Sequence, residues 1–106
     1  MDRLLILIFF FAFANLHSQS TISGEIKDSN GLPIEGANIY LIGTIDGSTS
    51  NSDGIFSFET SEKGNVTLIA SFIGYKDFSI TSDINKLKNI QIILQDDDSN
   101  LDEVII

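Results

Sequence analysis

Short apolar runs, each bounded by turn-forming residues, constrain the fold of this chain more than any other feature. The clearest run covers residues 66–72, where Val66, Leu68, Ala70 and Phe72 share one face because side chains alternate along a strand. No window has a convincing helical period, although residues 82–88 could form one helical turn. The other predicted strands cover residues 21–27, 37–41, 47–51, 56–58, 78–80 and 90–94. Short strands separated by turns predict an all-β fold, a small antiparallel sandwich of about seven strands.

The alternation also predicts which side chains form the core and how one short strand pairs. The inward-facing residues are Ile22, Ile26, Ala37, Ile39, Leu41, Phe56, Phe58, Val66, Leu68, Ala70, Phe72, Phe78, Ile80, Ile90, Ile92 and Leu94. Residues 47–51 are expected to pair with the strand at residues 56–58.

Glycine and asparagine define the predicted turns. Asn30-Gly31, Asp53-Gly54 and Gly64-Asn65 provide residues that tolerate the positive φ of tight hairpin turns. Pro33 precedes the second strand, where its missing N–H costs no ladder bond.

Acidic and amide side chains in the predicted turns and loops are candidate calcium ligands. The candidates are Asp28, Asn30, Asp46 and Asp53. Residues 28–33 lack the spacing to a terminal glutamate that an EF-hand-type loop requires. We therefore expect turn formation rather than metal binding.

The first 18 residues have the pattern of a secretory signal peptide. Arg3 precedes an apolar run that ends at Ala14, and this run is shorter than the roughly 20 residues of a spanning helix. Cleavage after Ser18 removes 18 of the 106 residues and leaves 88, beginning at Gln19. The alternative is an uncleaved membrane anchor. After cleavage, we expect no direct insertion of this chain into a membrane.

Composition excludes several classes of function. The chain has no cysteine, and its one histidine, His17, lies in the predicted signal, so nucleophilic triads and zinc sites lack their parts. Glu59 and Glu62 lie at a strand end, where a solvated surface role is expected. We predict neither catalysis nor a cofactor. The net charge of −9 disfavours nucleic acid and anionic membranes and favours a basic protein partner.

The order of the motifs resembles a known family. The matching pieces are Ile22-Ser23-Gly24, residues 28–38, residues 43–50, Asp53-Gly54-Ile55-Phe56 and residues 71–76, with Asn51 where the family often has Asp. Residues 22–94 resemble the carboxypeptidase-regulatory-like domain at the N-terminus of TonB-dependent outer-membrane receptors. The resemblance implies a transthyretin-like, Greek-key sandwich, here residues 19–95.

The C-terminal residues 96–106, hereafter the acidic tail, extend the resemblance. Asp96, Asp97 and Asp98 begin a charged linker that folds poorly by itself. The tail then ends in Leu101-Asp102-Glu103-Val104-Ile105-Ile106, which is similar to the segment that links the family's domain to the receptor plug and contains the TonB box. The residues of this TonB-box-like segment expected to bind a partner are Asp102, Glu103, Val104, Ile105 and Ile106.

The resemblance implies a non-catalytic periplasmic domain of a receptor for energy-coupled nutrient uptake. Its implied partners are the periplasmic domain of TonB and the plug and barrel of a parent receptor, at the periplasmic side of the outer membrane. Because this chain has no series of barrel strands, we interpret it as an N-terminal fragment or truncated form. The TonB-box-like segment has an alternative interpretation, in which residues 104–106 are the first residues of a further domain or form a last strand of this one.

Two alternative functions, from other classes of protein, remain for this chain. The first is a free secreted sandwich that serves as a structural or adhesive accessory module. The second is a carbohydrate-binding module, which needs an exposed aromatic platform. The chain has no tryptophan and only two tyrosines, Tyr40 on the outward phase of its strand and Tyr75 at the predicted sandwich edge.

Overall fold

The strands predicted from alternation are present in the computed structural model, which describes residues 18–97 of the chain. A single 3₁₀ turn lies where one helical turn was expected from the sequence. The elements are β1 (Ser20–Asp28), β2 (Asn38–Leu41), β3 (Gly47–Thr49), β4 (Ile55–Thr60), β5 (Asn65–Ser71), β6 (Phe78–Asp83), η1 (Ile84–Lys86) and β7 (Ile90–Leu94).

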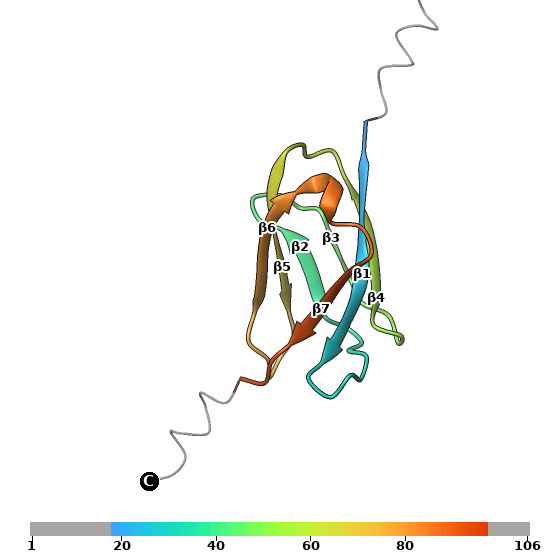
Figure 1. Cartoon of the computed structure of the whole chain (residues 1–106), viewed down its shortest axis with the longest axis vertical. Helices are drawn as coiled ribbons and strands as arrows, with labels where there is room; N and C mark the ends of the chain where they lie inside the picture. Colours follow the sequence, from blue (N-terminus) through green and yellow to red (C-terminus); the bar gives the residue numbers. More distant parts are fainter. Residues whose placement is uncertain (1–17, 98–106) are drawn as a thin grey trace, which may run out of the picture.

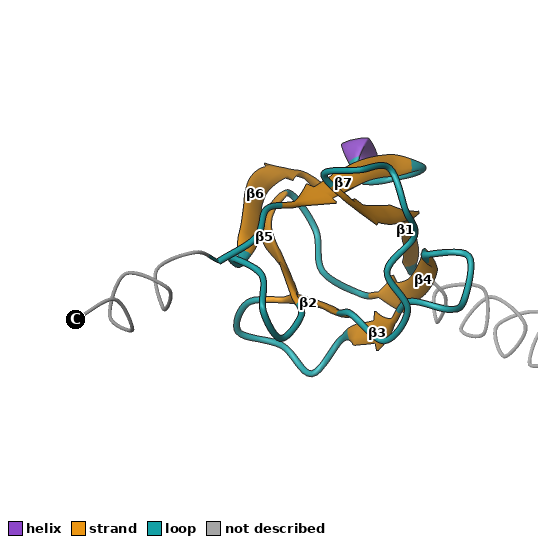
Figure 2. Ribbon diagram, turned by 90° about the horizontal axis from the view of Figure 1, so that it is seen from below, coloured by secondary structure: helices purple, strands orange, loops and turns teal. Residues whose placement is uncertain are grey.

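Two sheets face each other across the core and confirm the β-sandwich (Figure 2). Sheet A has the strand order β4-β1-β7, and sheet B has the order β3-β2-β5-β6. All pairs in sheet B and the β1–β4 pair are antiparallel. The β1–β7 pair is parallel, with Gly24 opposite Ile90 and Asp28 opposite Leu94. The sandwich is therefore antiparallel in all but this one pair of strands.

The predicted pairing of the short third strand is wrong. β3 pairs with β2, not with β4, and Ile39 lies opposite Ser48. A tight turn joins the two strands, because the Leu41 N–H donates to the Asp46 carbonyl at 3.1 Å. The Thr44 hydroxyl stabilises this turn by donating to the Leu41 carbonyl at 3.0 Å and accepting from the Asp46 N–H at 3.0 Å.

The core contains most of the predicted residues. Ile22 and Ile26 of β1 and Leu68 and Ala70 of β5 are 0% exposed. Five other predicted residues are only partly buried and pack against the core: Val66, Phe72, Phe78, Ile80 and Ile90. Three further core residues, not predicted from the strands, lie in connections: Ile34, Ile84 and Leu87. Side chains from outside the strands therefore complete the core.

Two side chains shape the predicted turns as expected. The Asp28 carboxylate accepts the N–H groups of Asn30 and Leu32 at 2.9 and 3.0 Å, while Gly31 has a φ of 84°. Asn51 forms the same kind of turn by accepting the N–H groups of Asp53 and Ile55 at 2.9 and 3.0 Å. These contacts favour the turn interpretation of the acidic and amide residues.

Pro33 lies at a position that needs no N–H, as predicted. It forms an isolated bridge with Lys27. The two hydrogen bonds beside this bridge come from the neighbours of these residues: the Asp28 N–H donates to Leu32 and the Ile34 N–H donates to Ile26.

Ser50 is a buried polar residue that sequence alternation did not identify. Its side chain accepts the Ala37 N–H at 3.0 Å and donates to the Ile34 carbonyl at 2.6 Å. Its backbone accepts the Gly36 N–H and donates to the Ala37 carbonyl. Ser50 therefore fixes the connection between β1 and β2 against the segment that follows β3.

Candidate functional site

The predicted partner-binding residues 102–106 lie outside the described residues. What the structure does describe is the place where the chain leaves the sandwich toward them. β7 ends at Leu94, and residues 95–97 continue past the end of sheet A. The candidate site therefore consists of this exit and its surroundings.

The exit is tied to the connection between β5 and β6. The Lys76 N–H donates to the Gln95 carbonyl at 2.8 Å, and the Asp97 N–H donates to the Gly74 carbonyl at 3.0 Å. Tyr75 and Asp96 form an antiparallel bridge between these two hydrogen bonds. We call this pair of segments, residues 74–76 and 95–97, the exit ladder. It joins the last residues of the sandwich to a loop of sheet B.

Local sequence explains the loop side of the exit ladder. Gly74 has a φ of 89°, a conformation that glycine adopts at little cost, and the Tyr75 N–H donates back to the Phe72 carbonyl at 3.1 Å. The Phe72 and Tyr75 rings lie 6.0 Å apart at a tilt of 41°, and both side chains pack against the core. The motif at residues 72–76 thus holds the exit ladder on the sandwich.

The chain enters and leaves the sandwich at opposite ends. Because β1 and β7 run parallel, the beginning of β1 and the end of β7 lie at opposite ends of sheet A (Figure 1). β1 has nine residues, which corresponds to about 30 Å at strand rise. The start of β1 and the end of β7 are therefore separated along the direction of the strands.

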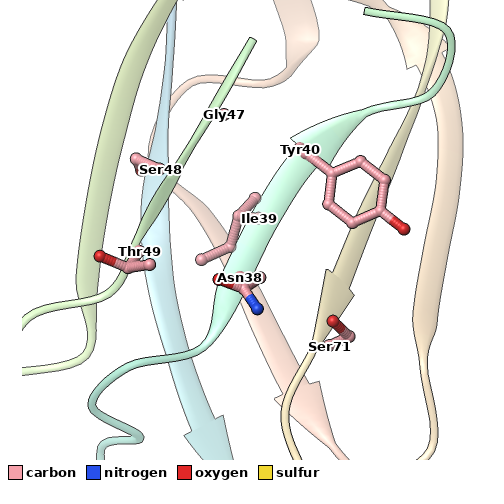
Figure 3. A pocket seen from close by; sticks show the side chains of 7 residues that line it. All are labelled: Asn38, Ile39, Tyr40, Gly47, Ser48, Thr49 and Ser71. Atoms are coloured by element: carbon pink, nitrogen blue, oxygen red, sulfur yellow. The ribbon is translucent and has the colours of Figure 1, made fainter. Parts of the chain in front are cut away.

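An open hollow lies on the outer face of sheet B. Its volume is about 560 Å³, and its lining residues are Asn38, Ile39, Tyr40, Gly47, Ser48, Thr49 and Ser71. Figure 3 shows the Tyr40 ring turned from β2 toward β5, while Ser48 and Thr49 lie on the other side of β2. A second hollow of about 430 Å³ shares Asn38 and Ser71 with the first and extends toward Phe72.

The chemistry of the first hollow is limited to hydrogen bonding and one aromatic contact. Tyr40 is 41% exposed, on the outward phase predicted for it. None of the residues that line this hollow carries a charge. One ring does not make the aromatic platform that carbohydrate stacking requires.

The acidic side chains are dispersed over the sandwich. Within residues 18–97, no group of His, Cys, Asp or Glu side chains is arranged to hold a metal ion. Asp46 accepts the hydroxyl of the buried Thr60 at 2.7 Å and so links the β2–β3 turn to the end of β4. Lys27 and Glu25 form a surface ion pair at 3.7 Å. These contacts of Asp46 and Glu25 are structural.

No helix within residues 18–97 is long and apolar enough to span a membrane. Residues 1–17 of the predicted signal peptide lie outside the described residues.

Comparisons with known proteins agree with the arrangement of motifs and strands. The family model of the CarboxypepD_reg-like domain matches residues 22–106. The TonB-dependent receptor P39 of Formosa agariphila is 34% identical over 103 residues, which cover 97% of this chain and 10% of the relative. The TonB-dependent receptor SusC of Bacteroides thetaiotaomicron is 35% identical over 88 residues, which cover 83% of this chain and 8% of the relative.

A solved structure shares the fold. A chain in a type II cohesin–X-dockerin complex from Acetivibrio cellulolyticus matches with a TM-score of 0.65 and 18% identity, over 74% of this chain and 59% of that chain. The chain spans about a tenth or less of the curated receptors to which it is similar. By the family match over most of its length, this chain belongs to the carboxypeptidase-regulatory-like domain family.

Proposed function

We propose that this chain is the N-terminal periplasmic domain of a TonB-dependent outer-membrane receptor and that it presents the TonB-box-like segment to TonB. The domain is non-catalytic in this proposal, and the receptor's plug and barrel follow it. The observation that carries the proposal is the similarity of nearly the whole chain to TonB-dependent receptors, of which it covers only a small part.

The position of the exit supports the presenting role. The exit ladder fixes the path of residues 95–97, so the acidic tail starts from a defined point of the sandwich. This point lies at the end of sheet A opposite to the beginning of β1. This arrangement of the two ends suits a spacer between two parts of an envelope protein.

The composition of the tail supports TonB as its partner. Asp102 and Glu103 precede the three β-branched residues Val104, Ile105 and Ile106. β-branched residues favour extended backbone, and an extended segment can add to the edge of a partner's sheet through main-chain hydrogen bonds. The acidic residues would favour a basic docking surface.

The test of the receptor assignment is to sequence the gene downstream of the codon for Ile106. The proposal predicts an open frame that continues into a plug and a series of alternating barrel strands. A stop codon directly after Ile106 would contradict it and would favour the free secreted module.

A further inference from the structure

We propose that the parallel β1–β7 pair makes the sandwich resistant to tension applied between the start of β1 and the end of β7. This inference goes beyond the proposed receptor function, because it concerns the mechanical resistance of the domain and does not depend on whether the tail binds TonB.

The direction of the two strands determines how tension acts on them. β1 receives force from the N-terminal side and β7 from the C-terminal side, and the two strands run parallel. Tension therefore pulls β1 and β7 in opposite directions along their own axes (Figure 1). The hydrogen bonds of a parallel ladder are evenly spaced along the strands, so this shearing motion loads them together rather than one after another.

The pairs on both sides of β1 oppose this sliding. Five residue pairs join β1 to β7, from Gly24 opposite Ile90 to Asp28 opposite Leu94. On its other edge, β1 forms six antiparallel pairs with β4, from Ser20 opposite Thr60 to Glu25 opposite Ile55. β1 is thus the central strand of sheet A, and its withdrawal requires both ladders to break.

Side-chain burial opposes the same motion. Ile26 on β1 is 0% exposed, and Ile92 and Leu94 on β7 are each 1% exposed. A shift of either strand by one residue would carry these side chains out of the core. On β1 it would place the charged Glu25 or Lys27 in the core in exchange for Ile26. The resistance therefore combines a ladder that is loaded all at once with apolar contacts that sliding would break.

Further hydrogen bonds fix both ends of β7. Before the strand begins, Ser23 donates its N–H to the Leu87 carbonyl and accepts the Asn89 N–H through its side chain, each at 3.1 Å. After the strand ends, the exit ladder adds the Lys76–Gln95 and Asp97–Gly74 bonds. The exit ladder contains residues 95–97, which follow β7. Tension applied at the C-terminus therefore acts on the exit ladder before it acts on β7.

Single-molecule pulling in two directions tests the proposal on the mature chain, residues 19–106. The chain has no cysteine, so introduced pairs give unique attachment points. The variant Q19C/D96C pulls β1 and β7 apart in shear. The matched control Q19C/K88C attaches the handle just before β7 and peels this strand from the end at which β1 begins. All three positions are exposed.

The expected result is an unfolding force roughly twofold or more higher for Q19C/D96C than for Q19C/K88C at the same pulling speed, since shear loads the ladder together. Equal forces, or a lower force for Q19C/D96C, would overturn the proposal. The same comparison with Q19C/Q95C and Q19C/N85C uses neighbouring exposed positions, so the outcome does not depend on the folding of one pair of variants.

Discussion

At the scale of single residues, Gly24 shows how a motif residue serves the packing of the core. It lies in the middle of β1, opposite Phe56 on one side and Ile90 on the other. A Cβ atom added at Gly24 would contact the Ile90 carbonyl oxygen and would lie 2.9 Å from the Phe56 ring. The missing side chain therefore makes room for the buried Phe56 ring, which is 2% exposed. In the sequence, Gly24 was recognisable only as part of a motif.

We predict that G24A destabilises the domain by about 1–3 kcal/mol, because the added methyl group overpacks a closed part of the core. Urea unfolding followed by circular dichroism measures the change in the free energy of unfolding. The matched control is S57A, at an exposed position of the adjacent strand, with an expected change within about 0.5 kcal/mol. Equal stability of G24A and the wild type would show that Phe56 does not pack against Gly24.

At the scale of strands, alternation predicted where β-structure forms better than how it is arranged. Period-two patterns identify the inward face, because burial on one side of a sheet selects apolar residues there. They do not identify the neighbour of a strand, and so the partner of β3 was predicted wrongly and the parallel direction of β1–β7 was not predicted. Ile34 and Leu87 were not predicted to be buried because they lie in connections, where no period exists.

Two positions of the β5 pattern, Leu68 in the middle and Phe72 at the end, provide a test of burial. Leu68 is 0% exposed, whereas Phe72 follows the last residue of the strand and is only partly buried. We predict that L68A costs about 2–5 kcal/mol of unfolding free energy, because it leaves a cavity in a closed core. F72A should cost less than L68A, since its surroundings can collapse or admit water. Thermal and urea unfolding of both variants measure the loss of stability. A loss for F72A as large as that for L68A would contradict this account.

At the scale of the whole molecule, the direction of the strands determines where the chain enters and leaves the sandwich. The parallel β1–β7 pair places the start and the exit at opposite ends, and the exit ladder defines where the acidic tail begins. From the sequence, the tail was predicted as the candidate site by its resemblance to the family's TonB-box segment, and its charge and β-branched residues agree with that prediction. The exit ladder was not predicted, because it depends on a contact between residues 74–76 and 95–97 that only the fold brings together.

The most direct test of the presenting role is isothermal titration of the mature chain, residues 19–106, with the periplasmic domain of TonB from the same bacterium. The account predicts one-to-one binding that is lost in I105P, because proline removes a main-chain donor that strand addition needs. The control S99P, in the linker part of the tail, should keep the wild-type affinity. Absence of binding by the wild-type chain, or unchanged affinity of I105P, would contradict the claim that the domain presents this segment to TonB.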